Sequence, residues 1–93
     1  MVRDNERVML VIRMEIKAVE EVENCITSLF AGKAVLRVDN QSVEENSAEA
    51  IYEVSDKMMT QAQKKNGMCS KIISEIKGVK SVSFVRQDDE INQ

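Results

Sequence analysis

The order of hydrophobic patterns along this chain predicts an α+β fold of the ferredoxin-like type, with the element order βαββαβ. Apolar and polar residues alternate strictly from Arg7 to Ile16, as in a half-buried strand. Two helical patterns follow, and each ends at a glycine, Gly32 or Gly78, the residue that most often ends a helix. Three further segments are predicted as strands. We therefore expect a four-stranded antiparallel sheet of order 4-1-3-2 with both helices on one face.

The first strand is expected at the centre of the sheet, because its alternation is unbroken. One of its faces carries only apolar side chains: Val8, Leu10, Ile12, Met14 and Ile16. The opposite face is charged at both ends and apolar only at Met9 and Val11. We expect that face to be open to solvent or to a partner over its middle.

The first helix is predicted over residues 18–31. Its apolar residues recur at spacings of three and four, so one stripe faces the sheet and the other faces water. Glutamates occupy its first turns, where the helix dipole favours negative charge. The last strand is predicted over residues 80–86.

Two middle strands are predicted over residues 34–39 and 48–55. The polar segment 40–47 between them is of the hairpin type but longer than a tight turn. Strict alternation would place Leu36 and Val38 on one side of the first of these strands.

The second helix has a clear end but two possible starts. It begins either at Asn66, whose side chain can cap the first amides, or near Asp56, with a weak point at an internal glycine, Gly67. The longer helix is favoured, because Ala62 and Cys69 continue one apolar face.

The composition favours one soluble domain and excludes several classes of partner. At 93 residues, a single domain is expected over residues 7–87, between flexible segments 1–6 and 88–93. The net charge is -3, and the 13 basic residues are scattered among 16 acidic ones, so nucleic acid is not an expected partner. Without an apolar run long enough to span a bilayer, the chain is expected in the cytoplasm, with any membrane link made by a missing part of a longer protein.

The sequence offers little for catalysis. It has no histidine, which removes the commonest general base and the commonest metal ligand. No catalytic residue, cofactor site or metal site is predicted. The segment Gly67-Met68-Cys69 resembles the opening of heavy-metal-associated domains, but the second cysteine of that motif is missing. Cys69 remains a candidate thiol, since a helix beginning at Asn66 would place its sulfur in the first turn and lower its pKa.

Methionine supplies candidates for an interaction surface. There are six in the chain, and methionine both fills cores and lines adaptable binding surfaces. The residues expected at an interface are Met9, Val11, Met58 and Met59.

Three stretches of the chain resemble a known family. Val8–Met14, Ala50–Val54 and Ile73–Phe84 look like the corresponding parts of an ACT-type regulatory domain. More specifically, the chain is similar to the cytosolic carboxy-terminal domains of bacterial integral-membrane proteins, including MgtC-type proteins and related families of unknown function. The resemblance implies pairing through sheet edges or helices and binding of small effectors at the interface. Amino-acid-binding ACT domains often carry a glycine after their first strand, where this chain has Lys17-Ala18.

These observations predict a non-enzymatic regulatory or protein-interaction domain that forms a homodimer and belongs to a bacterial membrane protein. One alternative is an ACT-like sensor that binds a small-molecule effector. Another is a small ferredoxin-like enzyme subunit with an intersubunit site around Cys69, Tyr52 or the acidic residues.

Overall fold

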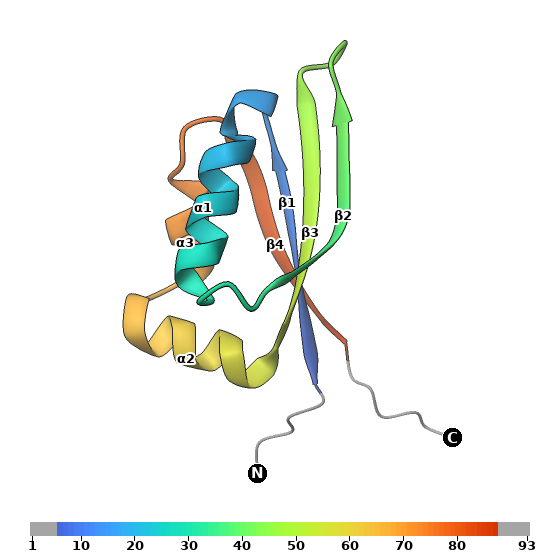
Figure 1. The fold of residues 1–93 in the computed structure, drawn as a ribbon. Helices are drawn as coiled ribbons and strands as arrows, with labels where there is room; N and C mark the ends of the chain where they lie inside the picture. Colours follow the sequence, from blue (N-terminus) through green and yellow to red (C-terminus); the bar gives the residue numbers. More distant parts are fainter. Residues whose placement is uncertain (1–5, 88–93) are drawn as a thin grey trace, which may run out of the picture.

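The computed structural model describes residues 6–87 and has the predicted ferredoxin-like fold (Figure 1). The expected flexible segments, 1–6 and 88–93, lie outside the described residues except for Glu6. The elements in chain order are β1 (Arg7–Met14), a 3-10 turn η1 (Ile16–Ala18), α1 (Val19–Leu29), β2 (Val35–Ser42), β3 (Ser47–Ser55), α2 (Asp56–Asn66), α3 (Cys69–Ser74) and β4 (Val79–Gln87).

The sheet has the order β2-β3-β1-β4, and every neighbouring pair is antiparallel. This is the predicted order, with β1 in the centre. Figure 1 shows α1, α2 and α3 on one side of the sheet, while no element of residues 6–87 covers the other side. The molecule is thus a two-layer structure with one covered and one uncovered sheet face.

Strand β1 ends two residues earlier than predicted, because the chain turns toward the helices. The amide of Glu15 donates to the carbonyl of Gly78 at 2.8 Å, and Ile16 opens the 3-10 turn. Gly78 has a φ of 98°, and a Cβ at this position would lie 3.1 Å from the Cβ of Ala18. Glycine is therefore required here both by its backbone conformation and by the close approach of the turn.

The second helical region consists of two helices. The hydroxyl of Ser55 accepts a hydrogen bond from the amide of Met58 at 3.1 Å, so α2 starts at the earlier of the two predicted positions. At Gly67 the backbone has φ 94° and ψ -163°, which ends α2. Cys69 then begins α3, and its amide donates to the side chain of Gln63 at 3.2 Å. The weak point expected at Gly67 is therefore a complete break between two helices.

The hairpin between β2 and β3 is tighter than predicted, since the strands stay paired as far as Ser42 and Ser47. Near the other end of β2 the register shifts, so that Leu36 lies opposite Tyr52 and Val38 opposite Ile51. Since Tyr52 and Ile51 point to opposite faces of β3, the prediction that Leu36 and Val38 share a face is wrong. A bulge reverses the alternation of a strand.

A single hydrophobic core fills the space between the sheet and the helices. Strand β1 supplies four of its members, each at most 1% exposed: Val8, Leu10, Ile12 and Met14. Burial of each such side chain stabilises the fold by about 1.5–3 kcal/mol. Within residues 6–87, none of the helices is long and apolar enough to cross a membrane.

Candidate functional site

The uncovered face of the sheet carries an apolar patch. Two neighbouring rows of cross-strand partners form it, one through Met9 and one through Val11 of the central strand. We define the open-face patch as the apolar members of these rows: Met9, Val11, Val35, Val38, Ile51 and Val85. Val35 is 46% exposed and Val85 is 50% exposed, while the four residues between them are half-buried by their neighbours.

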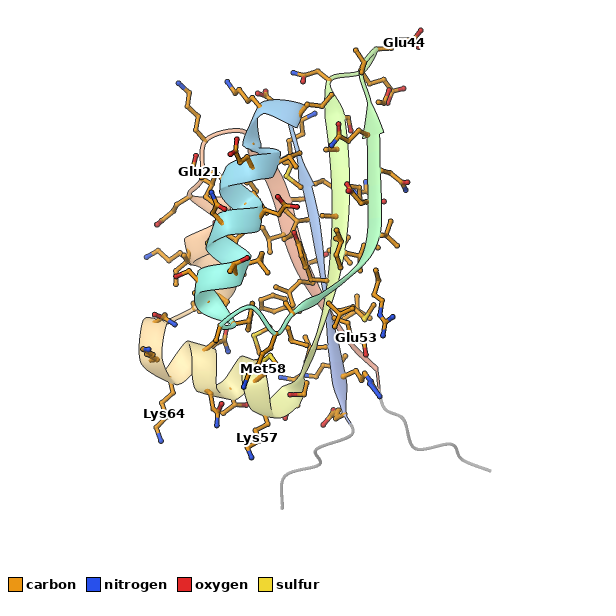
Figure 2. All side chains as sticks on the ribbon, viewed as in Figure 1. Glu21, Glu44, Glu53, Lys57, Met58 and Lys64 are labelled. Carbon is orange, nitrogen blue, oxygen red and sulfur yellow. The ribbon has the colours of Figure 1, made fainter. Side chains whose placement is uncertain are left out.

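Ion pairs lie at both ends of this patch, and one of them reaches into it, because Glu53 is the β3 member of the Met9 row, between Met9 and Val35. Glu53 accepts from two arginines, with Arg7 Nε at 2.7 Å from one carboxylate oxygen and Arg37 Nε at 2.7 Å from the other. Its side chain is 14% exposed, and Figure 2 shows it on the side of the sheet away from the helices. At the other end, Arg13 Nε lies 3.2 Å from a carboxylate oxygen of Glu49. Exposed pairs of this kind contribute at most about 1 kcal/mol each, so their main effect is to orient the charges.

Sequence reasoning found the centre of this patch and missed its flanks. Met9 and Val11 lie on the open face, as their alternation indicated. Ile51 and Val85 follow the same rule in β3 and β4, so the alternation of those strands carried a usable signal. Val38 could not be found this way, because the bulge reverses the face on which it lies.

The structure separates Met58 and Met59 from the other two predicted interface residues. Both belong to α2, on the covered side of the sheet, where Figure 2 labels Met58. Met58 is half-buried against the core. Met59 is 2% exposed, so the expectation that it is a surface contact is wrong. The physical reason is helical spacing: Met59 and Ala62 lie three residues apart on the buried stripe.

Cys69 is a core residue, and its burial disfavours the reactive thiolate form. Its side chain is 0% exposed at the start of α3. Burial raises the pKa of this thiol, and the nearby Cys25 thiolate raises it further. The expected lowering of the pKa is therefore absent, because desolvation outweighs any effect of the helix terminus. Both cysteines are free thiols.

The other side chain considered for catalysis is also enclosed. Tyr52 is buried, and its pKa is raised by that burial and then by the charges of Glu23 and Asp39. In the described part of the chain, no three cysteine, aspartate or glutamate side chains gather closely enough to hold a metal ion.

No protein-family model matches the sequence, and no curated protein matches it. Two solved structures resemble the fold. One is the C-terminal domain of the MgtC protein from Mycobacterium tuberculosis, with a TM-score of 0.64, 12% identity, and 99% of this chain and 100% of that chain covered. The other is the ACT domain of GTP pyrophosphokinase from Chlorobium tepidum, with a TM-score of 0.54, 11% identity, and 85% and 96% covered. The chain therefore has an ACT-like, ferredoxin-like fold of the kind seen in an MgtC carboxy-terminal domain.

Proposed function

We propose that this domain is a non-enzymatic regulatory module that acts by reversible self-association through the open-face patch. The observation that carries the proposal is the patch itself: six apolar side chains form two adjoining rows on a sheet face that no element of residues 6–87 covers. Contiguous exposed apolar patches on small soluble domains commonly mark contact surfaces.

The size of the sheet face indicates a weak dimer. Four strands about 4.8 Å apart, each about eight residues long with a rise of about 3.3 Å, give a face of roughly 500 Å² in projection. A standard stable interface takes about 800 Å² from each partner. The expected dissociation constant is therefore micromolar or weaker, which suits a module whose assembly responds to local concentration.

The charges around the patch suit a second copy of the same chain. A twofold interface brings the same surface from both subunits together, so each charged group needs its opposite within the same surface. Arg13 and Glu49 supply one such pair at one end of the patch. When the twofold axis passes between Arg13 and Glu49, Arg13 of each subunit also lies opposite the partner subunit's Glu49. The apolar centre then becomes buried with Arg13 and Glu49 matched across the interface.

Two variants test the proposal. Val11→Thr combined with Ile51→Thr keeps the β-branched shape that strands favour but makes the centre of the patch polar. We expect the dissociation constant measured by sedimentation equilibrium to rise about tenfold or more. The matched control is Val43→Thr in the hairpin turn, where the side chain is 84% exposed and outside the patch. A wild-type chain that stays monomeric at millimolar concentration contradicts the proposal, as does equal dimerisation of the two variants.

We extend the proposal to location: the domain is the cytoplasmic end of a longer bacterial membrane protein. Its likeness in fold to the C-terminal domain of an MgtC protein supports this, over nearly the full length of both chains. The complete reading frame tests it. It should encode apolar segments of about 20 residues outside this chain, and their absence would remove this part of the proposal.

An enzymatic role has less support than either binding role. Its two named candidates, Cys69 and Tyr52, are both buried, and burial raises the pKa of each. Effector binding, in contrast, is favoured by one specific feature, a basic cavity on the helix side of the molecule.

A further inference from the structure

A cavity of about 600 Å³ lies between the end of α1, the segment leading to β2, and α2. It is on the covered side of the sheet, away from the open-face patch. Its polar lining comes from three lysines (Lys33, Lys57 and Lys65), Ser28, Ser55, Gln61 and Asn66. The volume is within the range of small-molecule sites, about 300 to 1,000 Å³, and the cavity is an open depression at the surface.

The charge of this lining is opposite to that of the whole chain. The protein carries 16 acidic and 13 basic residues, yet three lysines and no carboxylate line the cavity. None of these three lysines has an ion-pair partner among the described residues. The acidic residue of the adjoining first turn, Asp56, is outside the lining and pairs with Arg86 on β4. The cavity is thus a local concentration of uncompensated positive charge.

Helix ends of both signs line this cavity, because the ends of α1 and α2 carry partial negative charge while the start of α2 carries partial positive charge. The positive charge of the cavity therefore comes from the three lysines. Ser55, Lys57 and Met58 all line the cavity, and they form the cap and first turn of an 11-residue helix. The N-terminal end of a helix carries a partial positive charge from its dipole. Carboxylates do lie nearby, since Lys33 also borders a hollow of about 180 Å³ that includes Glu6 and Glu53. That hollow adjoins the cavity, since Lys33, Ser55 and Met58 line both.

We propose that this cavity binds a small phosphorylated molecule carrying two or more negative charges. Lysine binds phosphate as a point charge, whereas the paired donors of arginine match carboxylate and phosphate alike. With three lysines and no arginine, the lining binds by charge density, which is higher on a doubly charged phosphate group than on a carboxylate. The one aromatic residue of the lining, Phe30, is buried in the core. The site therefore recognises charge and hydrogen-bond acceptors and not an aromatic ring.

The test is an amide NMR titration of the 93-residue chain with pyrophosphate at constant ionic strength. It is run in the Val11→Thr/Ile51→Thr background, so that a failure here is distinct from a failure of the dimer proposal. We expect saturable binding with a dissociation constant of about 1 mM or tighter. The shifted amides should include those of Ser28, Lys33 and Lys65. Chemical shifts that change linearly with the pyrophosphate concentration and do not saturate would overturn the proposal.

Two neighbouring lysines provide a matched pair of variants. Lys65→Gln removes a charge from the lining, and Lys64→Gln removes the same charge one residue away on α2, outside the lining (Figure 2). We expect Lys65→Gln to weaken pyrophosphate binding about fivefold and Lys64→Gln to weaken it less than about twofold. If both variants weaken pyrophosphate binding equally, the effect comes from the overall charge of the protein, and the proposed site is wrong. Citrate in place of pyrophosphate should bind more weakly, and equally tight binding of citrate would contradict the assignment to phosphate.

Discussion

At the scale of single residues, the chemistry of Cys69 is controlled by its burial. The raised pKa means that the folded protein keeps the thiol proton above about pH 8.5, where an unfolded chain releases it. The unfolded state then binds fewer protons than the folded state. Stability is therefore complete below the ordinary thiol pKa and falls as the pH rises through that value toward the folded pKa.

This linkage gives a test at one residue. When the pH rises from about 7.5 to about 9.5, the free energy of unfolding of the wild type should fall more than that of Cys69→Ala. The difference should reach at most about 1.4 kcal/mol, the free energy linked to one proton over one pH unit. Urea unfolding at the two pH values, with a reducing agent present, measures it. Cys25→Ala should change the pH dependence in the same direction, since burial and the charge of Glu21 raise the pKa of the half-buried Cys25 as well. Identical pH dependence of Cys69→Ala and wild type would contradict the assignment of Cys69 to the dry core.

At the scale of elements, the break between α2 and α3 depends on Gly67. Its φ of 94° with ψ of -163° lies in a region that is open almost only to glycine. Nothing lies within 4 Å of a Cβ built there, so the cost of a side chain is one of backbone conformation alone. Gly67→Ala should lower the free energy of unfolding by about 1–3 kcal/mol, measured by urea denaturation.

A D-amino acid at residue 67 distinguishes the effect of backbone conformation from the effect of steric crowding by a side chain. D-alanine at residue 67, introduced by chemical synthesis, favours positive φ and should leave stability close to that of the wild type. An L-alanine variant as stable as the wild type would mean that the α2–α3 break does not require this backbone conformation.

The elements also show what sequence reasoning can reach. The period-two pattern of β1 depends only on which residues are apolar, and it predicted the central strand, its buried face and the two open-face residues Met9 and Val11. The end of α2 was harder to predict, because a glycine inside a helical pattern is compatible with either a bent helix or a break between two helices. The β2 bulge left no pattern in the local sequence. It is fixed by pairing with β3, which a single segment does not contain.

The candidate site was predictable only in part for the same reason. Alternation can assign a residue to a face, but the breadth of the open-face patch depends on which strands become neighbours. Met59 illustrates the opposite error, since its type suggested a surface while its position three residues before Ala62 placed it in the core. The basic cavity joins Lys33 to a helix more than 20 residues later in the chain, a grouping that only the fold creates.

At the scale of the whole molecule, the two proposed functions occupy opposite sides. The helices cover one face of the sheet and form the basic cavity, while no element of residues 6–87 covers the other face. This arrangement lets a ligand and a second subunit bind without competing for the same surface. The central claim is that the open-face patch forms the contact.

Amide NMR spectra recorded during dilution of the wild-type chain test that claim most directly. From about 1 mM to 10 µM, the range in which a weak dimer dissociates, the account predicts that the shifting amides belong to Met9, Val11, Ile51 and Val85, while those of α2 stay constant. Shifts confined to the helices or to the outer edges of β2 and β4, or spectra that do not change with concentration, would contradict it.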